Sequence, residues 1–271
     1  MIEPLIHQPS FAASANTTSS LISRRQFLKC LGLGGVGLLT SVVAHQVTKN
    51  FSQNPPLRLI KSNNNLASRI IKYMVAKNYQ VFTELKEYNI VYVEGMNEDG
   101  SLNKNTPNQF NDRRIVIEVI DGVPKIVGNW EATTEPGDYY TYHPMNPGGA
   151  TRIKFGQYKA WAVGYHGNAD RHEALIQVAP VTVYRDFNKD FQRTGDKLDT
   201  GLFNVSQSWG YDAPSKNIKN ASAGSLVGRR RDGHREFMAL IKQDRRYVAN
   251  KDYVFYTTII PGDDLVKMFP G

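Results

Sequence analysis

The sequence predicts a mainly β protein of the α+β class, with one helix near the start of its folded domain and one late in the chain. The 271 residues include 14 Tyr and 12 Phe, residue types that favour strands. Apolar runs of strand length, several of them alternating with polar residues, recur from residue 89 to residue 261. From residue 66 onward, only two segments space their apolar residues as a helix does.

The two helices are predicted over residues 66–85 and 233–244. Apolar side chains recur at intervals of three and four in the first segment. In the second, Phe237, Leu240 and Ile241 share one face, and Arg245-Arg246 follow it, where cations suit the helix dipole. The apolar positions of the first helix are Ile70, Ile71, Met74, Val75 and Tyr79.

Strands are predicted in most of the remaining domain. The segment 114–130 should form a hairpin, because Asp121-Gly122 is a pair typical of type I′ turns. The segment 131–158, rich in Pro, Gly and Tyr, is expected to contain a long ordered loop, which either takes part in function or covers the sheet. The other predicted strands are 89–96, 151–166, 174–186, 201–210, 223–228 and 253–261.

Charge and cysteine content narrow the possible partners. A formal net charge of +8 is compatible with an anionic partner such as nucleic acid, a lipid surface or an acidic wall polymer. Apart from Arg229–Arg231 and Arg245-Arg246 the basic residues are spread along the chain, and no segment interleaves arginines with base-stacking aromatics. We therefore expect no nucleic-acid partner. Cys30 is the only cysteine, so an intramolecular disulfide is excluded.

Residues 1–44 are predicted to be an export signal. Arg24 and Arg25 precede an apolar, glycine-rich run from Leu31 to Ala44, which is short for a membrane span. The arginine pair with Phe27 shortly after it resembles the twin-arginine signal. We expect passage through the twin-arginine translocase to the periplasm or an equivalent extracytoplasmic space. Membrane contact is expected only if the signal is not cleaved.

The rest of the chain divides into a linker and one domain. Residues 45–65 contain Pro55-Pro56 and an asparagine run, which are typical of a linker. Residues 66–271 should form a single β-rich domain. This domain contains no GxGxxG, Walker, CxxC or HExxH motif, so no cofactor is expected other than calcium.

Calcium is a candidate because Asp186, Asn188 and Asp190 alternate as in the opening of a calcium loop. The pattern then departs from that loop. Phe191 stands where a glycine is required, and Lys197 stands where a bidentate Glu closes the coordination shell. A turn in which Asp and Asn side chains bond their own backbone is the alternative.

His166 is a candidate general base. It lies in the segment GYHGN, at the end of a predicted strand and next to a glycine. The alternative is a half-buried histidine that only forms hydrogen bonds.

Four segments resemble, in the same order, a bacterial and phage family that is similar to the catalytic domain of L,D-transpeptidases. They are PGDYYTYHPMNPGGATRIKFGQY (136–158), HEALIQVAPVTVYRDFNKD (172–190), DTGLFNVSQSWG (199–210) and SAGSLVG (222–228). The resemblance covers about 88–237 and implies an L,D-transpeptidase-like β-sandwich or barrel. The family's late motifs, GxNxH and SAGC, imply a cysteine nucleophile that is activated by a histidine and attacks a wall-peptide carbonyl.

This chain departs from those motifs at the reactive positions. Ser225 stands where the cysteine is expected, Ser208 stands where GxNxH has its histidine, and Ala223 occupies the position of the histidine in the S-H-G-C form of the motif. A serine hydroxyl is a weaker nucleophile than a thiolate and needs an activating base.

Three hypotheses follow. In the first, the domain is a degenerate L,D-transpeptidase-like domain, an inactive relative of these enzymes that binds peptidoglycan or an envelope partner. In the second, Ser225 is an active nucleophile, with His166 as its base. In the third, the chain is a structural calcium-binding envelope protein that uses Asp186, Asn188 and Asp190.

Overall fold

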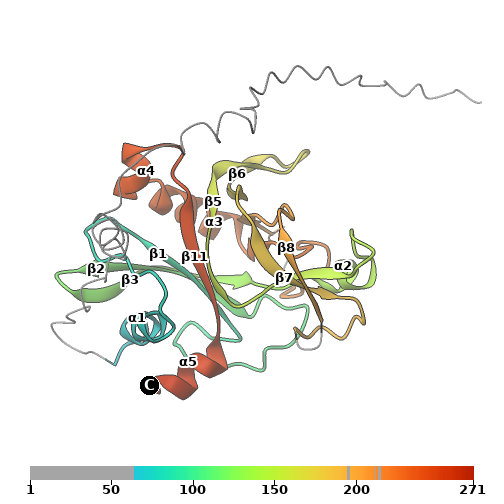
Figure 1. Cartoon of the computed structure of the whole chain (residues 1–271), viewed down its shortest axis with the longest axis horizontal. Helices are drawn as coiled ribbons and strands as arrows, with labels where there is room; N and C mark the ends of the chain where they lie inside the picture. The colour runs from blue at the N-terminus through green and yellow to red at the C-terminus, as the bar shows by residue number, and fades with distance from the viewer. Residues whose placement is uncertain (1–63, 194–195, 211, 213–214) are drawn as a thin grey trace, which may run out of the picture. The chain divides into compact units, whose positions relative to one another are not determined.

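The structure is a computed structural model that describes residues 64–193, 196–210, 212 and 215–271 (Figure 1). The predicted export signal (1–44), with Arg24, Arg25 and Cys30, lies outside the described residues. The predicted linker (45–65) does too, except for its last two residues.

The described domain is mainly β, which confirms the predicted fold class. Eight strands form a closed barrel in the order β1-β11-β5-β6-β9-β10-β3-β2, and β4, β7 and β8 form a separate three-stranded sheet. The barrel strands are β1 (Asn89–Glu94), β2 (Asp112–Ile120), β3 (Val123–Thr133), β5 (Gly156–His166), β6 (His172–Gln177), β9 (Gln207–Trp209), β10 (Leu226–Gly228) and β11 (Phe255–Pro261). The small sheet consists of β4 (Ala150–Ile153), β7 (Val181–Asp186) and β8 (Lys197–Gly201).

The predicted hairpin between β2 and β3 is present. Asp121 and Gly122 have φ angles of 52° and 75°, as both central residues of a type I′ turn require. The strands pair in antiparallel register from Asp112↔Ala132 to Ile120↔Val123.

Two predicted strands, 151–166 and 174–186, are each divided between the two sheets. The beginning of the first segment forms β4 and the end of the second forms β7, and these two strands pair in the small sheet from Ala150↔Asp186 to Ile153↔Val183. The rest of the first segment forms β5 and the beginning of the second forms β6, and these two strands pair in the barrel from Trp161↔Gln177 to His166↔His172. The two segments therefore form one long antiparallel ribbon, called the β4–β7 ribbon below, which passes from one sheet to the other.

The described part of the chain also contains five helices. Helix α1 (Leu66–Ala76) begins at Asn65, whose side chain accepts a hydrogen bond from the Ser68 N–H. It ends nine residues before the predicted boundary, where Asn78 adopts a φ of 57°. Helix α3 (Arg231–Ile241) corresponds to the predicted late helix. The remaining helices, which were not predicted, are α2 (Asp138–Tyr142), α4 (Arg245–Ala249) and α5 (Gly262–Met268).

Among the described residues, two large apolar clusters form most of the core, one on each face of β1, and a third, small cluster consists of Phe110, Ile218 and Val227. Alternate residues of β1 divide between them: Ile90 and Tyr92 face one cluster, while Val91 and Val93 face the other. The second cluster includes α1 and α5, which lie side by side in Figure 1. Burial on both faces explains why every residue of β1 is buried.

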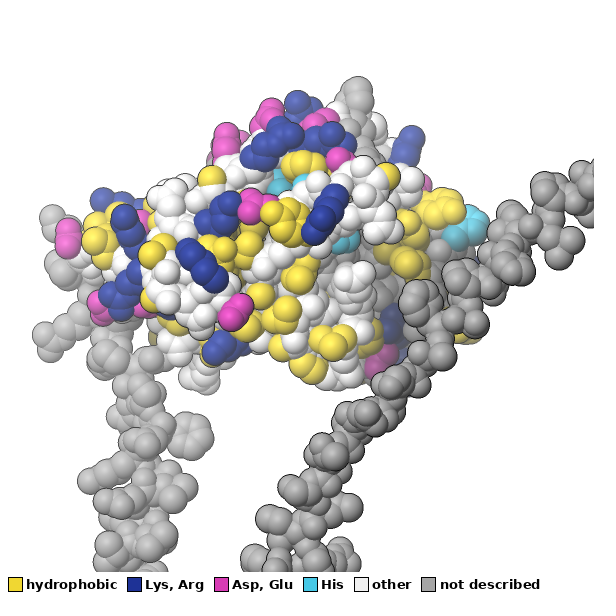
Figure 2. Space-filling view, turned by 90° about the horizontal axis from the view of Figure 1, so that it is seen from above, with side chains coloured by type: hydrophobic (Ala, Val, Ile, Leu, Met, Phe, Trp, Pro, Cys, Tyr) yellow, Lys and Arg dark blue, Asp and Glu magenta, His cyan; other side chains and the backbone are white. Residues whose placement is uncertain are grey.

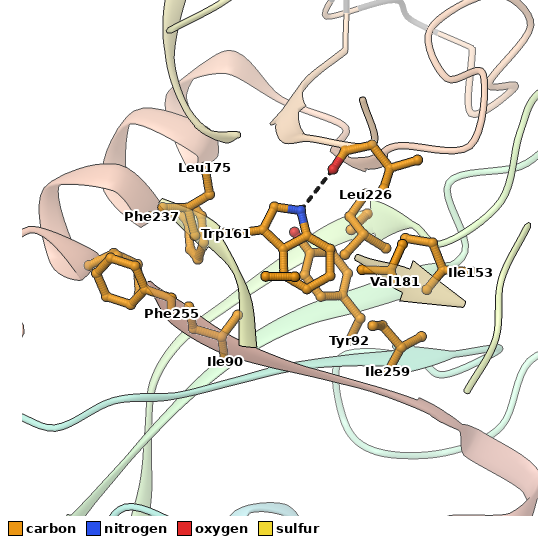
Figure 3. Packing of buried hydrophobic residues seen from close by; sticks show 14 of the residues in the cluster. Ile90, Tyr92, Ile153, Trp161, Leu175, Val181, Leu226, Phe237, Phe255 and Ile259 are labelled. Carbon is orange, nitrogen blue, oxygen red and sulfur yellow. Dashed lines mark hydrogen bonds between the residues drawn. The ribbon is translucent and has the colours of Figure 1, made fainter. Parts of the chain in front are cut away.

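Trp161 of β5 is the largest fully buried side chain of the first cluster (Figure 3). Its indole N–H donates a 2.8 Å hydrogen bond to the carbonyl oxygen of Val205. This hydrogen bond joins the side chain of Trp161 in the core to the backbone of the segment that precedes β9. In the described part of the chain, no helix has the length and apolar character needed to cross a membrane.

Candidate functional site

The three reactive positions predicted from the sequence line one cavity. Ser225, Ser208 and His166 lie around a space of about 580 Å³ beside the small sheet. They come from the turn before β10, from β9 and from the end of β5. Segments that lie far apart in the sequence are therefore brought together at one cavity.

Ser225 follows a tight turn that depends on glycine. Gly224 has a φ of +118°, and a Cβ atom there would lie 2.3 Å from the carbonyl oxygen of Thr151. The Ser222 hydroxyl accepts a 3.1 Å bond from the Gly224 N–H and donates a 2.9 Å bond to the Ser225 carbonyl. The turn therefore packs directly on β4 and leaves Ser225 half-buried at the cavity.

The hydroxyl oxygen of Ser225 is hydrogen-bonded to the backbone. It accepts a 3.1 Å bond from the N–H of Ser206. The N–H of Leu226 in turn donates a 2.9 Å bond to the Ser206 carbonyl. Parallel pairing of β9 with β10 sets Ser208 opposite Val227 and so fixes Ser208 on the strand beside the Ser225 turn.

His166 forms its hydrogen bond with Ser206. Its Nδ1 atom lies 3.0 Å from the Ser206 hydroxyl oxygen, and within the described residues no hydrogen bond joins His166 to Ser225. Burial, together with the nearby His172, lowers the pKa of His166 below its usual value and favours the neutral ring. Ser206 is completely buried, so it cannot itself meet a ligand.

Arg114 of β2 supports the site from inside the barrel, and sequence reasoning missed it. This fully buried guanidinium donates bonds of 2.9 Å to the Ser208 carbonyl and 3.3 Å to the Leu226 carbonyl. It also donates to the Tyr92 hydroxyl at 2.5 Å. Arg114 thus holds β9 and β10 together beneath the cavity. Nothing in the sequence distinguishes Arg114 from the other charged residues of β2, which are Asp112, Arg113 and Glu118.

A histidine and tryptophan cluster lies next to this support. His234 Nδ1 is 3.1 Å from an Arg114 nitrogen, so the ring accepts there and its Nε2–H donates to the Glu173 carbonyl. Burial and then the Arg114 charge lower the pKa of His234 to about 3. His172 stacks on Trp209 with ring centroids 3.9 Å apart. The rings of His234, His172 and Trp209 are therefore packed together, and the His234 ring is neutral.

The proposed calcium ligands are part of a turn. The buried Asp186 carboxylate accepts bonds from Arg152 Nε at 3.2 Å and from the backbone N–H groups of Asp190 and Phe191. The Asn188 amide donates a 2.8 Å bond to Asp190. Among the described residues, no group of three His, Cys, Asp or Glu side chains is arranged to hold a metal ion. This geometry is that of the alternative Asx turn, and calcium binding stays a prediction.

A buried ion-pair network lies behind the small sheet. Arg152 contacts Glu135 at 2.9 Å as well as Asp186, and Arg193 contacts Glu94. Burial, followed by the negative charge of Glu94, raises the pKa of Glu135 to about 7. Burial also disfavours ionisation of Glu94, but the Arg193 charge and hydrogen bonds outweigh it and lower that pKa.

The arginine run after β10 is paired rather than free. Arg229 contacts Glu131 at 2.7 Å, and Arg231 contacts Asp170 at 2.9 Å. Arg230 lies 3.6 Å from Asp212. Figure 2 shows acidic side chains interspersed with basic ones over one face of the molecule.

Arg185 of β7 also lines the cavity, and sequence reasoning did not single it out. It is the one Lys, Arg, Asp or Glu among the described residues around this space. The other polar lining side chains include those of Asn146, Thr151, Asn204 and Asn220.

Comparison of the chain with protein-family models, with curated proteins and with solved structures finds no match.

Proposed function

We propose that this chain is an exported cell-envelope protein whose domain binds wall peptides in the cavity at Ser225 without attacking them. The proposal combines two lines of argument. The twin-arginine-like segment supports export, and the four resembling segments support a peptidoglycan ligand. The geometry of the cavity supports binding over catalysis.

One observation supports the proposal most directly. The tight turn before Ser225 is present, but the side chains of Ser225 and His166 both form hydrogen bonds with Ser206 and, among the residues that the structure describes, none with each other. The Ser225 hydroxyl oxygen accepts the Ser206 N–H, and the expected base position holds Ser208. His166, the substitute base, bonds to the Ser206 hydroxyl. A serine nucleophile needs a base within about 3.2 Å, or one water away, to remove its proton.

The bridge through Ser206 does not provide a proton relay. His166 meets the Ser206 side chain, whereas Ser225 meets the Ser206 backbone N–H. A backbone amide donates a hydrogen bond but does not accept the serine proton at neutral pH. Ser225 therefore serves as a polar contact of the cavity wall, next to neutral amide and hydroxyl groups that suit a peptide ligand.

The test is to incubate the full chain with peptidoglycan fragments that carry tetrapeptide stems. Binding is measured by calorimetry, and cleavage, exchange or a covalent adduct is sought by mass spectrometry. We expect reversible binding and an unchanged protein mass.

A double variant, Ser208→His with Ser225→Cys, examines the same site from the other direction. It supplies the thiol and histidine that the resembling family uses. We expect the introduced thiol to attack a stem-peptide carbonyl and form a thioester, while the broken peptide bond releases the C-terminal residue of the stem as a free amine. The matched control, Ser208→His with Ser225→Ala, should form no thioester. An ester at Ser225 in the natural chain would contradict the proposal and support the serine acyl-enzyme, with the search for its base starting at His166.

A further inference from the structure

We infer that Arg185 anchors a carboxylate of the ligand, and that Asp199 is an exchangeable partner that occupies this anchor when no ligand is bound. The inference rests on the proposed function and deepens it, because it specifies the chemical class of the ligand and its orientation in the cavity.

The charge of the cavity selects an anionic ligand. Arg185 is cationic, and no Asp or Glu lies among the described residues that line the space. His166 favours the neutral form because burial and His172 lower its pKa. A ligand with one carboxylate would therefore meet a single fixed positive charge in otherwise neutral, polar surroundings.

Arg185 and Asp199 do not form the full bidentate pair of a guanidinium with a carboxylate. Arg185 Nε and Nη2 both point to the same oxygen, Oδ2 of Asp199, at 3.3 and 3.1 Å. The preferred pairing of a guanidinium with a carboxylate uses two oxygens and two parallel bonds. A ligand carboxylate that approaches edge-on would form that bidentate pair.

The two partners differ in how firmly they are held. The Arg185 side chain is 8% exposed, while that of Asp199 is 45% exposed. Arg185 is fixed further by a 2.8 Å bond from Nη1 to the Thr151 hydroxyl and by the Phe203 ring, 4.5 Å away. Asp199 belongs to β8, an edge strand of the small sheet. The Asp199 side chain can turn towards solvent because it is already close to half exposed, and the ligand carboxylate then replaces it as the partner of the buried Arg185 charge.

Thr151 relates the anchor to the Ser225 turn. It pairs directly with Arg185 across β4 and β7, and Gly224 packs against its carbonyl group. A carboxylate held by Arg185 would therefore direct the adjoining part of the ligand along β4 towards Ser225. The end of the ligand that carries the carboxylate would lie on the small sheet.

The experiment measures binding of two probes to the full chain by calorimetry. One probe is the peptidoglycan tetrapeptide with free carboxylates, and the other is the same peptide with every carboxyl converted to an amide. We expect the free acid to bind about tenfold more tightly, as befits one charge-assisted pair. Asp199→Asn should strengthen binding of the free acid severalfold and leave binding of the amide unchanged.

Variants separate the inference from the proposed function. Arg185→Gln should abolish the preference for the free acid. Glu173→Gln, which removes a carboxylate of similar exposure paired with Lys242 away from the cavity, should change neither affinity. If both peptides bind equally to the natural chain and to Asp199→Asn, the proposed function survives and the inference is overturned. If neither peptide binds, the proposed function itself fails.

Discussion

The imidazole Nδ1 of His166 lies 3.0 Å from the hydroxyl oxygen of Ser206, a side chain that is completely buried. The relationship joins the end of β5 to the segment entering β9, so the histidine acts as a strut between two strands. Because Ser206 also donates its backbone N–H to Ser225, one residue fixes both groups that a serine mechanism would need to bring together.

Replacing the buried hydroxyl should weaken the fold without creating an enzyme. Ser206→Ala removes the partner of His166, and we expect the free energy of unfolding to fall by about 1–2 kcal/mol. Denaturant unfolding measures the loss. Ser101→Ala, which removes an exposed hydroxyl bonded to Asp99, is the control and should have little effect. Adduct formation in Ser206→Ala would show that the strut had restrained an active base.

The turn before Ser225 should tolerate no side chain at Gly224. In Gly224→Ala the methyl group would meet the Thr151 carbonyl oxygen at 2.3 Å, in a backbone conformation with φ of +118°. We expect a loss of about 3 kcal/mol, seen as a lower melting temperature. Gly156→Ala is the matched control, because its nearest neighbour is a side-chain atom 3.4 Å away. Equal melting temperatures for the two variants would contradict this account of the turn.

The core tryptophan should affect both stability and the cavity. Trp161→Phe removes the bond to the Val205 carbonyl and leaves unfilled volume, so we expect a loss of about 2–3 kcal/mol. Val205 lines the cavity, so peptide binding should weaken as well. Trp130→Phe, at a half-buried position away from the cavity, should preserve peptide binding. An unchanged affinity for the peptide in Trp161→Phe would show that the cavity does not depend on the contact between Trp161 and Val205.

The raised pKa of Glu135 predicts a pH-dependent stability. Its pKa is about 7 in the folded chain, above its ordinary value of 4.5, so the folded state binds the extra proton between these values. The contribution of Glu135 to the free energy of unfolding therefore decreases as the pH rises from about 4.5 to 7, by up to about 3 kcal/mol.

Glu135→Gln, which keeps an acceptor for Arg152 but does not titrate, should reduce this decrease. Unfolding in denaturant at a series of pH values between 4 and 8 measures the difference. Glu84→Gln, at an exposed position, should follow the natural chain. If the Glu135→Gln profile runs parallel to that of the natural chain throughout, Glu135 does not titrate in this range.

The sequence was sufficient for the fold class, but not for the arrangement of charges around the cavity. Periodicity predicted β1 and α3, and the Asp121-Gly122 pair predicted the hairpin, because local residue types determine these features. Periodicity could not divide 151–166 between two sheets, since the change of sheet depends on contacts with distant strands. Ser208 and Ser225 were found by their motif positions, and the structure places both at one cavity.

Arg114 and Arg185 were missed for a related reason. A charged residue in a strand is usually exposed, and only the closed barrel and the small sheet bring their partners around them. The pairing of His166 with Ser206 could not be foreseen either, because it joins residues 40 positions apart across two strands.

The β4–β7 ribbon has a consequence for how the domain unfolds. Ile153, Val181 and Val183, on its outer part, belong to the same apolar cluster as Trp161 on its inner part. Opening the small sheet would therefore uncover the interior of the barrel, so the two sheets should melt in a single cooperative transition. Backbone amides of β7 and β5 should then show similar protection from hydrogen exchange. The wall that carries Arg185 would remain in place whenever the barrel is folded.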